Sequence, residues 1–197
     1  AGPAYACSMP NEINALVADA RRRLRAAGIA RDEAALDARL LAQHALGWDA
    51  ARLMTHGDEP ATAPFQQAFE ALVARRIARE PLAYITATRE FWNLSIEVAP
   101  AVLIPRPETE LLLEASLEHF DRGLALRILD VCTGSGCVAV GLAREFRMAA
   151  VTASDISEDA LDVARRNVAK YGLASRVRCI HADLLAGLPG PFDLIVA

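Results

Sequence analysis

The chain has 197 residues, of which 53% are hydrophobic and 23% are charged. This is enough apolar material for one large or two small packed domains, and it excludes global disorder. The 25 acidic residues outnumber the 21 basic ones, which argues against general binding to a nucleic-acid backbone, because such binding requires a basic face.

The sequence carries no sign of a membrane or secretory protein. No run of about 18 apolar residues could span a bilayer, and Ala1 to Pro10 lacks the basic and apolar regions of a secretory signal. The four cysteines are not spaced as metal ligands are, and we expect reduced thiols, no metal site and a cytoplasmic location. These cysteines are Cys7, Cys132, Cys137 and Cys179.

Residues 1–80 predict a small helical bundle. An apolar stripe at helical spacing is formed by Ile13, Leu16, Val17, Ala20 and Leu24. A second helix is predicted to start at Asp32, and a third carries apolar residues from Phe65 to Ile77 on one face. The abundant alanines favour helix and allow close packing.

Residues 81–104 predict a β-hairpin linker. The segments Ala83 to Thr86 and Phe91 to Val98 are rich in β-branched and aromatic residues and are expected to be its strands. Pro107 suits the first turn of a following helix, which is expected to run to about Phe120.

Residues 105–197 alternate between strand and helix patterns. Strands are expected near 126–131, 150–154, 177–181 and 193–196, and helices near 136–146 and 158–171. This order predicts an α/β, Rossmann-like domain. A complete domain of this kind needs about six strands or more, so we expect the chain to be the amino-terminal piece of a longer protein.

A glycine loop follows the first of these strands. The run from Gly134 to Ala139 fits the pattern G-x-G-x-x-A, which by itself permits a nicotinamide or flavin dinucleotide. Asp155 comes nineteen residues after Gly136, at the end of the next strand, where a carboxylate can accept two hydrogen bonds from a ribose diol. The loop therefore predicts a ligand that contains a nucleoside.

Asp130 distinguishes between the two kinds of nucleoside ligand. It lies just before the glycines, where a carboxylate would repel a pyrophosphate but attract an ammonium and a sulfonium group. We therefore favour S-adenosylmethionine and keep a dinucleotide as the alternative. After the third strand, Asp183 can accept a hydrogen bond from an adenine amino group, and Leu184 can contact the adenine ring.

Three segments together resemble a known family. Glu80-Pro81-Leu82-Ala83-Tyr84-Ile85, Arg89-Glu90-Phe91-Trp92 and Leu103-Ile104-Pro105-Arg106-Pro107-Glu108-Thr109-Glu110 are similar to the signature of the HemK/PrmC protein-(glutamine-N5) methyltransferases. The resemblance implies an incomplete class I methyltransferase domain at 105–197, and a domain at 1–80 that helps to recognise the protein substrate. It also implies methylation of the glutamine side-chain amide in the Gly-Gly-Gln motif of peptide chain release factors. The ribosome would then be at most an indirect partner, with no direct nucleic-acid or membrane partner.

The resemblance also extends the set of cofactor contacts expected from the residues themselves. It implies that the loop, the ends of the next two strands and the Arg-Pro segment contact S-adenosylmethionine. The full set comprises Asp130, Cys132, Thr133, Gly134, Ser135, Gly136, Asp155, Ile156, Asp183, Leu184, Arg106 and Pro107.

Two departures from the family pattern stand out. Cys132 occupies a position where the family usually has glycine, and Cys-Thr-Gly-Ser-Gly-Cys resembles enzymes that methylate a glutamine of a large-subunit ribosomal protein. That substrate is the first alternative. A nucleic-acid amino methyltransferase, an NAD-dependent oxidoreductase and a non-catalytic binding module are weaker ones.

The second departure concerns catalysis. The family's Asn-Pro-Pro-Tyr motif follows a strand like Phe192 to Val196, and the printed sequence ends at Ala197. We therefore expect this 197-residue chain to bind cofactor without transferring methyl groups.

Overall fold

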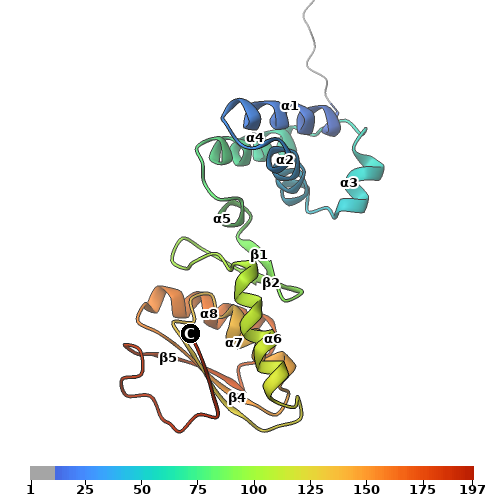
Figure 1. Cartoon of the computed structure of the whole chain (residues 1–197). Helices are drawn as coiled ribbons and strands as arrows, with labels where there is room; N and C mark the ends of the chain where they lie inside the picture. The colour runs from blue at the N-terminus through green and yellow to red at the C-terminus, as the bar shows by residue number, and fades with distance from the viewer. Residues whose placement is uncertain (1–11) are drawn as a thin grey trace, which may run out of the picture. The chain divides into compact units, whose positions relative to one another are not determined.

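The computed structural model describes residues 12–197, so Cys7 and the segment Ala1 to Pro10 lie outside the described residues. The chain divides into two compact units, and the boundary along the chain lies between Thr86 and Ala87 (Figure 1). No helix between residues 12 and 197 combines the length and hydropathy that a membrane crossing requires.

The first unit is helical. Its helices are α1 (Ile13–Ala26), α2 (Arg31–Leu46), α3 (Ala50–His56), α4 (Ala63–Ile77) and α5 (Leu82–Thr86) (Figure 1). The predicted stripe on α1 is confirmed, because Ile13, Ala20 and Leu24 are buried in the core of the unit and two more of its members pack against that core. Local caps define the shorter helices: the Asp49 side chain accepts a hydrogen bond from the amide of Arg52 at the start of α3.

A largely buried network of ion pairs joins α2 to α4. The guanidinium of Arg76 donates to Asp37 Oδ2 at 2.7 Å and to Glu33 Oε1 at 2.6 Å. Arg76 and Asp37 are buried, whereas Glu33 is exposed. Because each buried charge has a partner, both are tolerated within the helical unit.

The second unit contains a parallel sheet preceded by a hairpin and a helix. The hairpin strands are β1 (Thr88–Phe91) and β2 (Leu94–Glu97); then follow the short 3-10 helix η1 (Pro107–Thr109) and α6 (Glu110–His119). The sheet region contains β3 (Arg127–Val131), α7 (Cys137–Glu145), β4 (Ala150–Asp155), α8 (Glu158–Lys170), β5 (Val177–His181) and β6 (Leu194–Val196). These elements confirm the predicted α/β alternation.

The sheet has the strand order β5-β4-β3-β6, with all described pairs parallel. The order reverses beside β3, which has β4 on one side and β6 on the other. Ligands of such sheets bind beyond the carboxyl ends of the strands at this reversal. Helix α7 contacts α6, α8 and the sheet, and its residues from Cys137 to Ala143 are therefore buried all round.

The strand prediction for Ala83 to Thr86 is wrong, because this segment is the helix α5. The amides of Tyr84 and Ile85 donate to the carbonyl of Pro81, which starts a helical turn. Ala87 then adopts a left-handed conformation with φ 57° and ends it.

The predicted second strand, Phe91 to Val98, is interrupted by the hairpin turn. Trp92 (φ 51°) and Asn93 (φ 56°) are both left-handed, as a tight two-residue hairpin turn requires. Tryptophan is unusual at such a position, and two tertiary hydrogen bonds hold it there. Its amide donates to Glu110 Oε1 and its indole Nε1 donates to Glu145 Oε1, each at 2.8 Å. The hairpin thus belongs to the second unit.

Candidate functional site

The carboxyl ends of β3, β4 and β5 meet at one edge of the sheet. Val131 pairs with Ser154, and Asp155 pairs with His181, so the segments that follow these strands are neighbours. The backbone adds two connections across this edge: Thr133 N donates to Ser154 O at 2.9 Å, and Ala182 N donates to Asp155 O at 3.0 Å. The residues predicted from three separate motifs therefore come together.

The glycine loop leads from β3 into α7 through three left-handed residues. These are Cys132 (φ 56°), Gly134 (φ 55°) and Gly136 (φ 76°). A Cβ on Gly136 would lie 3.1 Å from the Cβ of Ala164 on α8, whereas a Cβ on Gly134 would meet no atom within 4 Å. Gly136 is thus needed for packing, and Gly134 faces open space that a ligand can occupy.

Asp130 holds the loop from within. The Asp130 side chain is 3% exposed, and its Oδ2 accepts hydrogen bonds from the Thr133 hydroxyl at 2.5 Å and from the Ala139 amide at 3.1 Å. Burial raises the pKa of Asp130 to about 7, against these two hydrogen bonds, which favour the carboxylate. Because both described partners of this oxygen belong to the protein, Asp130 shapes the loop and can act on a ligand through its field.

Asp155 reaches the outer side of the same loop. Its Oδ2 accepts from the Gly134 amide at 2.9 Å, and its Oδ1 accepts from the Ser157 amide at 3.0 Å. The side chain is half-buried, so its carboxylate remains in contact with solvent beside Gly134. The predicted N-cap at Ser157 is confirmed, since its hydroxyl accepts from the Ala160 amide at the start of α8.

Two apolar side chains are exposed at the ends of the next strands. Ile156 is 62% exposed and Leu184 is 61% exposed, and Leu184 is held in a left-handed conformation with φ 51°. Asp183 is exposed between Leu184 and the end of β5. Exposed apolar groups beside a carboxylate are suited to a flat ring that carries a hydrogen-bond donor.

The remaining predicted residues differ in position. Thr133 and Ser135 are buried within the loop, and Cys132 is exposed at its start. Arg106 directly precedes η1 and Pro107 is its first residue; both are exposed, and among the described contacts none joins them to the glycine loop.

Asn167 is a site residue that the motifs did not reveal. It lies on α8, is 0% exposed, and its Nδ2 donates to the carbonyl of Ser135 in the glycine loop at 2.9 Å. A signal was present in the sequence, because Asn167 interrupts the apolar face formed by Val163, Ala164 and Val168. A polar residue at such a position must find buried partners.

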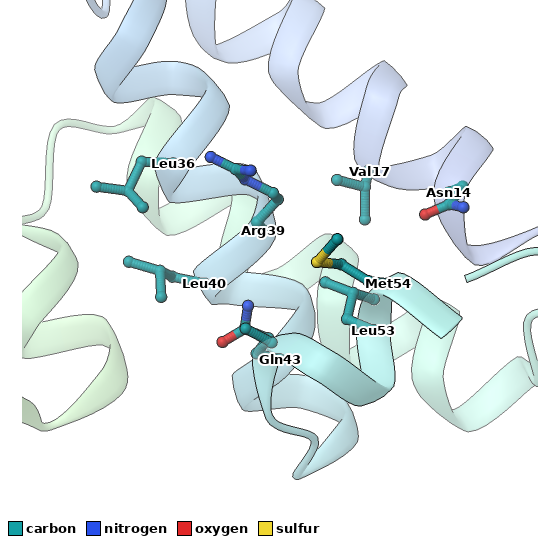
Figure 2. Close-up of a pocket in the computed structure, with 9 residues that line it drawn as sticks. Asn14, Val17, Leu36, Arg39, Leu40, Gln43, Leu53 and Met54 are labelled. Atoms are coloured by element: carbon teal, nitrogen blue, oxygen red, sulfur yellow. The ribbon is translucent and has the colours of Figure 1, made fainter. Parts of the chain in front are cut away.

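The helical unit has a concave surface of its own, with a volume of about 320 Å³. Figure 2 shows Val17 of α1, Leu36 and Leu40 of α2, and Leu53 and Met54 of α3 around it. Its rim is polar and is formed in part by Asn14, Arg39 and Gln43. This surface is apolar and lacks the paired backbone amides and carboxylates of the glycine-loop site.

Family models match both units. The model described as the PrmC N-terminal domain matches residues 15–86, and a model described as a methyltransferase domain matches residues 128–197. The two matches are in the order that the resemblance predicts.

Curated relatives match most of the chain. The release factor glutamine methyltransferase of Burkholderia pseudomallei is 48% identical over 83% of this chain and 59% of its own length. The protein of the same name from Bordetella pertussis is 44% identical over 82% of this chain and 60% of its own length. That from Deinococcus radiodurans is 39% identical over 94% and 66%. The chain thus spans 59–66% of the length of these relatives. With both domains matched in order, the chain belongs to the PrmC family of methyltransferases.

Proposed function

We propose that the intact protein transfers a methyl group from S-adenosylmethionine to the side-chain amide of the glutamine in the Gly-Gly-Gln motif of peptide chain release factors. The observation that carries this proposal is the joint match of both units to relatives named release factor glutamine methyltransferase. The segment from Pro105 to Glu110 adds support, because its Pro-Arg-Pro-Glu-Thr-Glu run resembles the same family.

The charges at the glycine loop and the open space beside Gly134 are compatible with S-adenosylmethionine. The carboxylate of Asp155 beside the loop favours a cationic ligand over a dianionic pyrophosphate, and a cationic ligand would also favour the ionised form of Asp130 beneath the loop. The open space in front of Gly134 leaves room for a ligand. A bound S-adenosylmethionine supplies an electrophilic methyl group on its sulfonium.

Each side chain then has a distinct role in binding. The half-buried carboxylate of Asp155 would accept hydrogen bonds from the ribose diol, and Asp183 would accept one from the adenine amino group. Ile156 and Leu184 would cover the adenine ring with apolar surface, since each is about 60% exposed without a ligand. Arg106 and Pro107 would lie against the cofactor, as the family resemblance implies.

The chemistry itself depends on orientation. An amide nitrogen is a poor nucleophile because its lone pair is delocalised, so the protein must align it with the methyl group and exclude water. In the family, the Asn-Pro-Pro-Tyr motif does this after a strand like β6, whose pairing with β3 brings it to the same edge of the sheet as the glycine loop. This strand pairing supports the proposal, because it would bring the substrate nitrogen and the cofactor to the same edge of the sheet.

We assign recognition of the protein substrate to the helical unit. Its apolar concave surface is open to solvent, with Met54 84% and Leu36 49% exposed (Figure 2). Exposed apolar surface rimmed by polar groups is characteristic of protein contacts. A Met54→Glu variant of the intact protein should raise KM for release factor and leave the affinity for S-adenosylhomocysteine unchanged. The matched control is Ala71→Glu, which places the same charge at an exposed position on α4.

The decisive test incubates the intact protein with S-adenosylmethionine and either purified release factor or the purified large-subunit ribosomal protein. Peptide mass spectrometry then locates any added methyl. Methyl on the Gly-Gly-Gln glutamine supports the proposal. Methyl on the ribosomal protein alone would show that the Cys132 to Cys137 loop is the better guide to the substrate. Binding of S-adenosylhomocysteine, measured by calorimetry, tests the cofactor separately, and Asp155→Ala should weaken it by about tenfold or more.

A further inference from the structure

The buried face of α8 contains one side chain whose hydrogen bonds join two distant parts of the second unit. Asn167 is 0% exposed, and its Oδ1 accepts from the amide of Glu97, the last residue of β2, at 2.8 Å. Its Nδ2 donates to the Glu97 carbonyl at 2.9 Å and to the Ser135 carbonyl at 2.9 Å. The acceptor and both hydrogens of the amide are therefore used, two of the bonds on the hairpin and one on the glycine loop.

The bond to Ser135 constrains the backbone of the loop. The Ser135 carbonyl and the Gly136 amide belong to one planar peptide group, so fixing one fixes the other. Asn167 holds the carbonyl, and the Gly136 amide donates to the Thr133 carbonyl at 2.8 Å. Both ends of this peptide plane are thus anchored, which maintains the left-handed conformation of Gly136.

Helix α8 can make this bond because it lies very close to the loop. Ala164 is three residues before Asn167, on the same face of the helix, and its Cα is 3.2 Å from the position that a Cβ on Gly136 would take. The approach is possible because Gly136 has no side chain and Ala164 has only a methyl group. It brings Asn167 within hydrogen-bonding distance of the Ser135 carbonyl.

From this arrangement we propose that Asn167 is a positioning residue for the cofactor: it holds the glycine loop in its binding conformation and couples that loop to the β1-β2 hairpin. The proposal rests on the cofactor site proposed above. Asn167 would not touch the ligand, and acts through the Ser135–Gly136 peptide. Its connection to Glu97 means that anything that displaces the hairpin also loosens the loop.

Neighbouring contacts separate this role from simple attachment of the hairpin. Arg166 Nε donates to Glu97 Oε1 at 2.6 Å, and the Lys170 ammonium and the Tyr171 hydroxyl both donate to the Ser95 carbonyl. The described bonds of these side chains join α8, and Tyr171 directly after it, to the hairpin without reaching the loop. Arg166→Gln is therefore a matched control, since it weakens the same helix-to-hairpin contact and leaves the Ser135 bond in place.

The test compares Asn167→Asp, Asn167→Ala and Arg166→Gln in the intact protein. Asn167→Asp keeps the acceptor for the Glu97 amide but removes both donors. We expect both Asn167 variants to bind S-adenosylhomocysteine about tenfold more weakly and to exchange the Gly136 amide hydrogen faster. Arg166→Gln should change either quantity by less than about twofold, because an exposed ion pair contributes little. If the Asn167 variants only lower the unfolding temperature, with affinity and loop exchange unchanged, the proposal is overturned.

A measurement on the wild-type protein covers the case in which the variants do not fold. Coupling is reciprocal, so S-adenosylhomocysteine should slow hydrogen exchange at the Glu97 amide. The control is the Trp92 amide at the far end of the hairpin, which is held by Glu110. Equal slowing at both amides would contradict the coupling. If the wild-type protein binds no S-adenosylhomocysteine, the proposed function fails. The role of Asn167 is then decided by comparing ligand-free exchange of the Gly136 amide in the wild-type protein with that in the Asn167 and Arg166 variants.

Discussion

Gly136 and Ala164 lie so close together that no side chain fits between the glycine loop and α8. A Cβ built on Gly136 would lie 3.1 Å from the Cβ and 3.2 Å from the Cα of Ala164. The first glycine of the motif is different, since Gly134 has the same left-handed backbone but open space in front of it. The two glycines of one motif therefore serve different purposes, one for packing and one for access.

This difference predicts that alanine at Gly136 mainly lowers stability, whereas alanine at Gly134 mainly lowers cofactor affinity. Gly136→Ala should lower the free energy of unfolding by about 1–3 kcal/mol more than Gly134→Ala, because only the former meets backbone and side-chain atoms of α8. Gly134→Ala should mainly weaken binding of S-adenosylhomocysteine. Urea denaturation and calorimetry measure the two effects. A double-mutant cycle of Gly136→Ala with Ala164→Gly should show a coupling energy, and strict additivity would contradict the contact.

Cys132 provides a second test of the loop. Its φ of 56° is costly for any residue with a Cβ, and the side chain is exposed, so little packing is lost on its removal. Cys132→Gly should raise the free energy of unfolding by about 0.5–1 kcal/mol, after allowing for the greater freedom of glycine in the unfolded chain. Cys132→Ala keeps the left-handed strain and should have little effect. A similar change in both variants would point to the thiol rather than to the backbone.

The raised pKa of Asp130 predicts a pH dependence of stability. Below pH 3.8 the group is protonated in both the folded and unfolded chains. As the pH rises toward 7, the unfolded chain releases the proton while the folded chain retains it, so the free energy of unfolding falls and then levels off. About three pH units at about 1.4 kcal/mol each put the loss at no more than about 4 kcal/mol.

Asp130→Asn isolates this contribution, because an amide of the same shape does not titrate. Denaturation from pH 4 to 8 should show a steeper fall for the wild-type protein than for the variant between pH 4 and 7. Parallel profiles would mean that Asp130 ionises normally inside the fold.

The helical unit offers a test on two adjacent arginines of α4. Arg76→Ala leaves the carboxylate of Asp37 buried without its partner and should cost about 3–5 kcal/mol of unfolding free energy. Arg75→Ala removes an ion pair with Glu80 from a solvent-exposed position and should cost less than about 1 kcal/mol. Thermal unfolding of both variants measures the difference. Equal losses would show that burial of the Asp37 pair contributes nothing.

Local patterns in the sequence were sufficient to predict most helices and strands of this protein. The helical stripe of α1 and the alternation of strands and helices along the second unit follow from side-chain spacing, which depends only on neighbours along the chain. The spacing of Gly134, Gly136 and Asp155 likewise pointed to one edge of the sheet, because a parallel sheet brings the ends of successive strands together.

The same local rules failed where distant contacts set the backbone. Trp92 has no turn preference, and it is left-handed because Glu110 and Glu145 accept hydrogen bonds from its amide and its indole. The α5 segment contains β-branched residues yet forms a helical turn anchored on Pro81. Neither outcome could be read from composition, since propensity is weaker than such tertiary contacts.

The chemistry of the site divides in the same way. The sequence by itself determined which groups are present: a glycine loop, a carboxylate before it and another after the next strand. Only the tertiary structure decided that Asp130 is buried beneath the loop while Asp155 is half-buried beside it, and that Asn167 joins the loop to the hairpin. Burial and hydrogen-bond partners depend on distant segments, as in the bond between Asn167 and Glu97, which are 70 residues apart, and no local pattern encodes them.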